Sequence, residues 1–205
     1  MTRKRVAVLI SGRGSNLAAL IDAAKAEDYP ADIALVLSNR PDALGLARAR
    51  DAGIPTAVVD HRPFGDDREA FERALDAELN ARRIELVCLA GFMRLFTPWF
   101  VGRWSGRLLN IHPALLPQFK GLHTHRRALE SGVRRHGATV HFVVAETDAG
   151  PIILQDSVAI LDGDTEETLA ARVLEVEHRI YPQALRLVAE GRASFDSADA
   201  AKNAR

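Results

Sequence analysis

The sequence predicts an α/β protein built on an open, mostly parallel twisted sheet with helices on both faces. Short apolar runs alternate with segments of helical periodicity as far as residue 90. The first run, Val6 to Ile10, is continuously apolar, which is typical of a strand that is buried on both faces. The segments between the runs are long enough for the crossover that two parallel neighbours require. In sheets of this class, ligands bind beyond the carboxyl ends of the strands.

The first half of the chain contains the clearer elements. Its apolar and β-branched runs predict strands at residues 6–10, 33–37, 56–59 and 86–90. Helical spacing predicts helices at 17–24, 43–51 and 66–83. The last of these helices carries Phe71, Leu75 and Leu79 on one stripe, as a helix that faces a core does.

The second half is less regular. Strands are expected at 108–111, 139–144 and 152–160, followed by a long helix from 165 to 190. Pro182 should kink that helix or restart it, because proline removes one helical hydrogen bond. Residues 194–205 are small and polar and are expected to form a disordered tail. A single domain over residues 1–193 is therefore expected.

Composition excludes several classes of function. The 27 basic and 27 acidic residues give a formal net charge of zero, which argues against a nucleic-acid partner. The single cysteine, Cys88, lies in an apolar run and can form no internal disulfide, so a cytoplasmic protein is expected. The apolar run at Val6 to Ile10 is too short for a signal peptide or a membrane span, so no membrane partner is expected.

The balanced total hides a local excess of positive charge. Between Val101 and Val140 there are seven basic residues and one acid, Glu130. Such a stretch can be a solvated basic face, or it can provide the field that holds a small anionic ligand. Both interpretations stay open at this point.

A glycine-rich turn follows the first strand. Residues 11–16, Ser-Gly-Arg-Gly-Ser-Asn, lie where backbone N–H groups and a helix dipole can hold a phosphate. As a dinucleotide fingerprint the turn is incomplete, because Leu17 stands where a third glycine is required. The alternative is a plain strand-to-helix turn that is capped by Ser15 or Asn16.

Asn110 lies near the end of the strand expected at 108–111, and His112 directly follows that strand. Residues two apart on a strand share a face, so this amide and imidazole could together stabilise charge on a carbonyl oxygen. Asp148 precedes a Gly-Pro turn and, if it lies beside His112, should raise the pKa of that histidine and fix its tautomer. The alternatives are a turn cap, a buried core histidine and ordinary turn chemistry.

Two other chemistries receive little support. His123 and His125 lie close together, but their neighbours suggest a loop and nothing provides the geometry of a metal site, so no metal is expected. The Gly-x-Ser-x-Gly motif of a serine nucleophile does not occur in the sequence.

Taken together and in order, the segments of this chain resemble those of the glycinamide ribonucleotide formyltransferases, the folate-dependent enzymes of purine synthesis. The resemblance covers about Val6 to Gly191. The segments that carry it are Leu9–Leu17, Leu89–Arg94, Leu108–Pro117, Gly121–His125, Thr139–Val143, Asp148–Gln155 and Glu177–Pro182.

This resemblance implies a formyltransferase-like, Rossmann-related fold and a reaction. The formyl group of 10-formyltetrahydrofolate, the co-substrate, would pass to the amine of 5-phosphoribosylglycinamide. In the family's pattern, the catalytic trio corresponds to Asn110, His112 and Asp148. The ribonucleotide would be bound by Gly14, Ser15, Asn16 and Glu177.

The resemblance also implies a folate pocket. The matching residues are Arg68, Met93, Arg94, Leu95, Phe96, Asn110, Val144, Ala145, Glu146, Thr147 and Asp148. The expected partners are therefore two small molecules, and the chain would be a monomer or a homodimer. The alternatives are formyltetrahydrofolate hydrolase, disfavoured because no regulatory domain precedes Val6, and a nicotinamide-dependent oxidoreductase, disfavoured by the missing third glycine.

Overall fold

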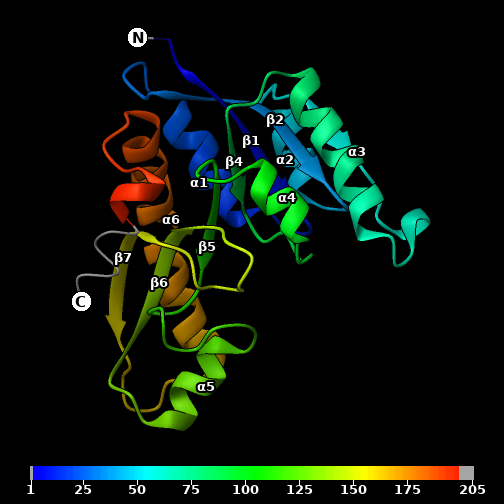
Figure 1. The fold of residues 1–205 in the computed structure, drawn as a ribbon. Coiled ribbons are helices and arrows are strands. Elements are labelled where there is room, and N and C mark those ends of the chain that lie inside the picture. Colours follow the sequence, from blue (N-terminus) through cyan, green and yellow to red (C-terminus); the bar gives the residue numbers. More distant parts are fainter. Residues whose placement is uncertain (1, 199–205) are drawn as a thin grey trace.

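A computed structural model describes residues 2–198 and contains a seven-stranded sheet in the order β3-β2-β1-β4-β5-β6-β7 (Figure 1). The strands of the first part, β1 to β5, pair in parallel, whereas β6 is antiparallel to β5 and β7 is antiparallel to β6. The prediction of an open, mostly parallel sheet is thus confirmed. The strand bounds are β1 Lys4–Ile10, β2 Ala31–Ser38, β3 Thr56–Val58, β4 Leu86–Leu89, β5 Leu108–His112, β6 Arg135–Phe142 and β7 Ile152–Ala159.

Helices cover both faces of the sheet, as predicted. Alternate residues of β1 point to opposite faces, and each set enters a different apolar core. One core holds Val8 together with residues of α1, α2 and α6, and the other holds Leu9 together with residues of α3 and α4. The helix bounds are α1 Ser15–Ala24, α2 Gly45–Asp51, α3 Arg68–Ala81, α4 Pro98–Arg103, α5 Thr124–Ser131 and α6 Glu166–Ala189, with a 3-10 turn at Arg62–Phe64.

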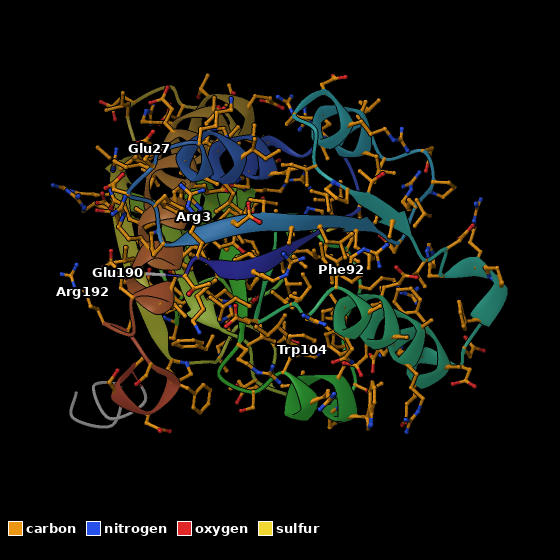
Figure 2. All side chains as sticks on the ribbon, turned by 90° about the horizontal axis from the view of Figure 1, so that it is seen from above. Arg3, Glu27, Phe92, Trp104, Glu190 and Arg192 are labelled. Carbon is orange, nitrogen blue, oxygen red and sulfur yellow. The ribbon has the colours of Figure 1, made fainter. Side chains whose placement is uncertain are left out.

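The core beneath α3 and α4 is rich in aromatic rings. Phe92 and Trp104 are both buried there and lie on the same side of the sheet (Figure 2). On the other core, Cys88 is fully buried, and burial raises the pKa of its thiol to about 12. Cys88 therefore packs as a small apolar side chain, as its position in the sequence predicted. No helix of residues 2–198 is both long enough and apolar enough to cross a membrane.

Two expectations need correction. Helix α6 does not restart at Pro182 but runs through it, because Ile180, Tyr181 and Ala184 around the proline are buried against the sheet and outweigh one missing hydrogen bond. Residues 120–123, including His123, lie in a loop as expected, but His125 lies in α5, which begins at Thr124.

The second half also differs from the prediction at a strand and at the tail. Strand β6 spans 135–142 and not 139–144, because β7 pairs with it back to Arg135, where the sequence shows no clear alternation. Residues 194–198 do not belong to a disordered tail: 195–198 form a helical turn, and the Phe195 ring lies 5.8 Å from that of Phe142. The rest of the predicted tail, 199–205, lies outside the described residues.

Candidate active site

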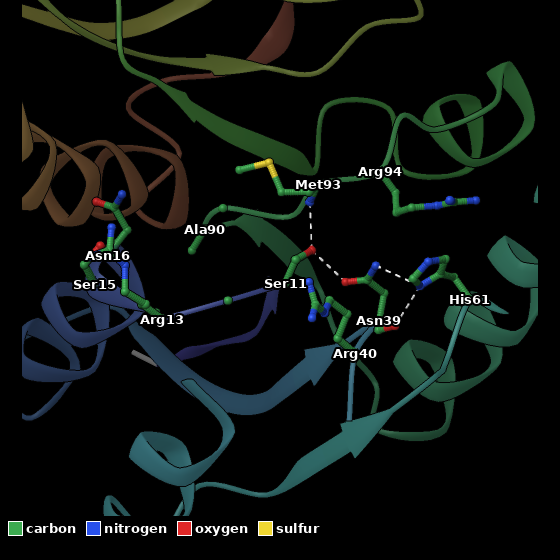
Figure 3. Close-up of a pocket in the computed structure, with 13 residues that line it drawn as sticks. Ser11, Arg13, Ser15, Asn16, Asn39, Arg40, His61, Ala90, Met93 and Arg94 are labelled. Carbon is green, nitrogen blue, oxygen red and sulfur yellow. Dashed lines mark hydrogen bonds between the residues drawn. The ribbon is translucent and has the colours of Figure 1, made fainter. Parts of the chain in front are cut away.

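The carboxyl ends of β1, β2 and β4 meet around one cavity of about 610 Å³ (Figure 3). The glycine-rich turn forms one wall, and the segment after β4 forms another. The lining residues are Ser11, Gly12, Arg13, Gly14, Ser15, Asn16, Asn39, Arg40, His61, Ala90, Gly91, Met93 and Arg94. This is the place where sheets of this class bind their ligands.

The glycine-rich turn leaves the start of α1 open to an anion. Gly14 precedes the helix with a φ of 73°, and an added Cβ would lie 3.0 Å from the Cα atom of Gly45. Glycine is therefore required both by the backbone conformation and by the close packing. Neither Ser15 nor Asn16 caps the helix, contrary to the plain-turn alternative, and no other described side chain does so. The first N–H groups of α1 are thus available to a phosphate.

Asn16 points instead to the long helix α6. Its amide Nδ2 donates a hydrogen bond of 2.6 Å to Oε2 of Glu177. Both side chains are buried, and burial raises the pKa of Glu177 above its ordinary value, while Asn16 acts in the opposite direction. Two residues predicted to bind the ribonucleotide, 161 positions apart, are therefore in direct contact.

Asn110, His112 and Asp148 come together at the end of β5, the neighbour of β4 in the sheet. The Nδ1 atom of His112 lies 3.4 Å from Oδ2 of Asp148. Asp148 has a φ of 50°, and its Oδ2 also accepts a hydrogen bond of 2.9 Å from the backbone N–H of Gly121. The strained conformation of Asp148 thus places its carboxylate between a loop and the histidine.

His141 completes this cluster and was missed as a site residue by sequence reasoning. It lies opposite Asn110 in the antiparallel pairing of β5 with β6, and its Nε2 is 3.3 Å from Nδ2 of Asn110. The same Nε2 lies 3.7 Å from Oδ1 of Asp148. Its Nδ1 is 2.9 Å from the carbonyl oxygen of Phe142, which can only accept, so Nδ1 carries a proton. The alternation of residues 139–144 indicated that His141 lies on a strand, but only the register of β5 with β6 shows that His141 faces Asn110.

The protonation of His112 differs from the expectation. Burial lowers the pKa of His112, and the carbonyl of Phe119 and the charge of Asp148 offset this effect only in part. Asp148 thus acts in the expected direction, but burial outweighs it, so the pKa of His112 is lowered overall and the neutral imidazole is favoured near neutral pH in the protein without substrates. Its Nε2 donates to Phe119 O at 3.0 Å, so in the neutral ring the lone pair is on Nδ1.

Asp148 is ionised in this arrangement. Burial by itself would raise the pKa of the carboxyl group. The hydrogen bond from the Gly121 N–H and the nearby rings of His141 and His112 hold the pKa below its ordinary value. The site therefore pairs a carboxylate with a neutral imidazole that it can stabilise in the protonated form.

The residues predicted for the folate pocket are only partly gathered around the cavity. Met93 and Arg94 line it. Leu95 is exposed, and Phe96 stacks between the rings of Phe92 and Phe100, at centroid distances of 5.3 and 4.3 Å. Arg68, the exposed first residue of α3, does not line it. Residues 144–147 form the loop before Asp148, where Glu146 pairs with Lys120.

Five lining residues lie outside the glycine-rich turn and were not predicted as site residues: Asn39, Arg40, His61, Ala90 and Gly91. Asn39 and Ala90 directly follow β2 and β4, so the rule that ligands bind beyond carboxyl ends could have found them. His61 lies in a loop, and no sequence pattern indicates its position. Within residues 2–198, no group of three or more His, Cys, Asp or Glu side chains is arranged to hold a metal ion.

Comparison with known proteins assigns the chain to a family. The family model described as formyl transferase matches residues 4–185. Phosphoribosylglycinamide formyltransferase of Escherichia coli is 51% identical over 187 residues, which are 91% of this chain and 88% of that protein. The trifunctional purine biosynthetic protein adenosine-3 of Gallus gallus is 54% identical over 91% of this chain, but the chain spans only 18% of that longer protein.

Solved structures agree with this assignment. Glycinamide ribonucleotide transformylase 1 from Symbiobacterium toebii has a TM-score of 0.89 and 50% identity, covering 93% of this chain and 89% of that one. A formyltetrahydrofolate deformylase from Pseudomonas syringae has a TM-score of 0.84 at 31% identity, covering 93% of this chain and 63% of that one. The fold is thus shared by two kinds of enzyme, and sequence identity favours the first. The chain belongs to the formyl transferase family, within the group of phosphoribosylglycinamide formyltransferases.

Proposed function

We propose that the protein transfers the formyl group of 10-formyltetrahydrofolate to the amine of 5-phosphoribosylglycinamide. The observation that carries this proposal is the cluster of Asn110, His112 and Asp148 at the same sheet edge as the anion-binding turn. The half-identical relative from Escherichia coli, which bears the name of this activity and is spanned by the chain over 88% of its length, supports it.

In the proposed reaction, the amine nitrogen attacks the formyl carbon and the carbonyl oxygen becomes an oxyanion. The amide N–H of Asn110 that does not face His141 and the protonated ring of His112 stabilise this charge. The bond from the formyl carbon to N10 of the folate then breaks. The proton lost by the amine passes to Nδ1 of His112, which charges the ring, and then to N10, so the products are the formylated ribonucleotide and tetrahydrofolate.

Asp148 makes the protonated state of His112 accessible. A proton that reaches Nδ1 of His112 lies 3.4 Å from a carboxylate oxygen, and the opposite charge favours the imidazolium. The ring can therefore be neutral at rest and become charged when charge develops on the substrate. This makes the stabilisation specific for the transition state.

The two substrates would occupy different walls of the site. The backbone of Gly14 and Ser15, with Asn16 and Glu177 behind them, would hold the ribonucleotide through its phosphate. Met93 and Arg94 line the folate side, and the remaining members of the proposed folate pocket are Arg68, Leu95, Phe96, Asn110 and residues 144–148.

The test is a formyl-transfer assay with and without the ribonucleotide. Consumption of 10-formyltetrahydrofolate should require 5-phosphoribosylglycinamide, and formylated product should appear at the same rate. Equal consumption without the amine would indicate the deformylase reaction instead. His112→Ala should lower the transfer rate by several orders of magnitude while the ribonucleotide still binds, whereas a protein that only binds anions would keep its function.

Three further expectations belong to this proposal. Asn110 and His112 supply the charge stabilisation, so we propose that no metal takes part, and dialysis against a chelator should leave the rate unchanged. The predicted assembly is a monomer or a homodimer, and analytical ultracentrifugation of the purified protein distinguishes the two. The predicted compartment is the cytoplasm, and imaging of a tagged chain in cells tests this.

A further inference from the structure

Three strand ends meet at Ser11, the buried residue that follows β1. Its backbone N–H donates to the carbonyl of Gly91 at 3.1 Å. Its hydroxyl donates to Oδ1 of Asn39 at 2.6 Å and accepts a hydrogen bond of 2.8 Å from the backbone N–H of Met93 (Figure 3). One serine thus connects the ends of β1, β2 and β4 at the floor of the cavity.

The segment that Ser11 holds, residues 91–97, joins β4 to α4 without regular structure. At its far end, the backbone N–H of Thr97 donates to the buried carboxylate of Glu72 at 2.6 Å. In its middle, Phe96 is held by the stack of aromatic rings. On the cavity side, Met93 is 73% exposed, so this wall is anchored locally by two hydrogen bonds to Ser11: one from the Met93 N–H to the Ser11 hydroxyl and one from the Ser11 backbone N–H to the carbonyl of Gly91.

The opposite wall does not depend on the same hydroxyl. Backbone bonds hold the glycine-rich turn: Gly45 N–H donates to Gly12 O at 3.0 Å, and Ala18 N–H donates to Gly14 O at 3.1 Å. The close packing of Gly14 against Gly45 adds to them. Removing the Ser11 side chain would therefore loosen one wall and leave the other in place.

The direction of the hydrogen bonds is set by Asn39. Its Oδ1 lies 2.6 Å from the Ser11 hydroxyl, and its Nδ2 lies on the side of His61, 3.2 Å from Nδ1 of that ring. An amide oxygen can only accept, so the hydroxyl proton of Ser11 points to Asn39. The lone pairs of the hydroxyl are then free to accept the N–H of Met93.

We propose that Ser11 is a positioning residue for the folate side of the cavity, acting through the backbone of Met93. The inference rests on the proposed function, in which Met93 and Arg94 contact the folate and residues 14–16 hold the ribonucleotide. Ser11→Ala should raise the KM for 10-formyltetrahydrofolate about three- to tenfold, the effect of losing one hydrogen bond. The KM for the ribonucleotide should stay within about twofold of the wild type.

Two further variants support the measurement. Asn39→Ala should raise the KM for the folate less than Ser11→Ala does, because the bond from Met93 remains. Adding Asn39→Ala to Ser11→Ala should then change that KM by less than the sum of the two single effects. Ser105→Ala, at an exposed serine after α4, is the matched control and should leave both KM values unchanged.

The outcomes distinguish this inference from the proposed function. Equal rises in both KM values, or an unchanged KM for the folate, would overturn it. If Ser11→Ala does not fold, as judged by its thermal unfolding, the same comparison is made with Asn39→Ala. If the wild type fails to transfer the formyl group, calorimetry with tetrahydrofolate still decides: the Kd should rise about three- to tenfold in Ser11→Ala. Absence of tetrahydrofolate binding to the wild type would overturn both proposals.

Discussion

His112 and Asp148 face each other across 3.4 Å, although the histidine ends a central strand and the aspartate lies in a loop between two antiparallel strands. The contact depends on the reversal of chain direction after β5. The backbone N–H of Gly121 also donates a hydrogen bond to the Asp148 carboxylate, so the loop before α5 belongs to the same cluster. The carboxylate thereby joins three separate segments around one imidazole.

The first prediction concerns the charge of Asp148. Asp148→Asn keeps the shape and can still accept from Gly121, but it removes the charge that favours the imidazolium of His112. The rate of formyl transfer in a single turnover should fall about 10²- to 10⁴-fold. Affinity for the ribonucleotide, measured by calorimetry, should stay unchanged. Asp162→Asn, at an exposed position, is the control, and equal rates for Asp148→Asn and wild type would remove Asp148 from the mechanism.

The second prediction concerns Glu177, whose contact with Asn16 joins α6 to the glycine-rich turn. Glu177→Ala leaves the buried amide of Asn16 without its acceptor, so the turn should lose its support on that side. The KM for 5-phosphoribosylglycinamide should rise about tenfold or more, with a smaller effect on the KM for the folate. Glu175→Ala, exposed on the same helix, should change neither value. A normal KM in Glu177→Ala would contradict the proposed role.

The third prediction concerns stability in acid. Burial and the neighbouring His125 lower the pKa of His136 to about 4. An unfolded histidine has a pKa of about 6.5, so between these values the unfolded chain binds more protons than the folded one. The contribution of His136 to stability is therefore complete above pH 6.5 and is lost as the pH falls toward 4.

Urea unfolding at pH 7.5 and pH 5 tests this effect. His136→Gln is neutral at both values, so its free energy of unfolding should fall less between them than that of the wild type. His178→Gln, on α6, serves as a comparison with a less buried ring. Identical losses in the wild type and in His136→Gln would show that His136 does not titrate on unfolding in this range.

The fourth prediction concerns the turn after Asp148. A Cβ atom at Gly150 would lie 1.7 Å from the carbonyl oxygen of Phe142, so alanine cannot fit without moving the backbone. Gly150→Ala should lower the free energy of unfolding by more than about 2 kcal/mol and should also reduce the transfer rate by displacing Asp148. At Gly102, in α4, an added Cβ meets nothing within 4 Å, so Gly102→Ala should be neutral or stabilising by up to about 1 kcal/mol. Equal stability of the two variants would contradict the packing argument.

Much of the fold follows from local patterns. The continuous apolar run of β1 and the stripe of Phe71, Leu75 and Leu79 on α3 predicted elements that the structure contains. Such patterns report which faces are buried, and burial is the main driving force for each element. Helices α4 and α5, of 6 and 8 residues, escaped prediction because they are too short to show a long apolar stripe.

The sequence by itself determined the class of fold, the glycine-rich turn at the start of α1, and the identity of the residues whose catalytic role is proposed. Only the tertiary structure decided that His141 pairs with Asn110, that Ser11 joins three strand ends, and that burial keeps the resting His112 neutral. The physical reason is the distance along the chain over which each determinant acts. Periodicity and turn chemistry act over a few neighbouring residues, whereas strand register and burial depend on segments that are distant in the chain.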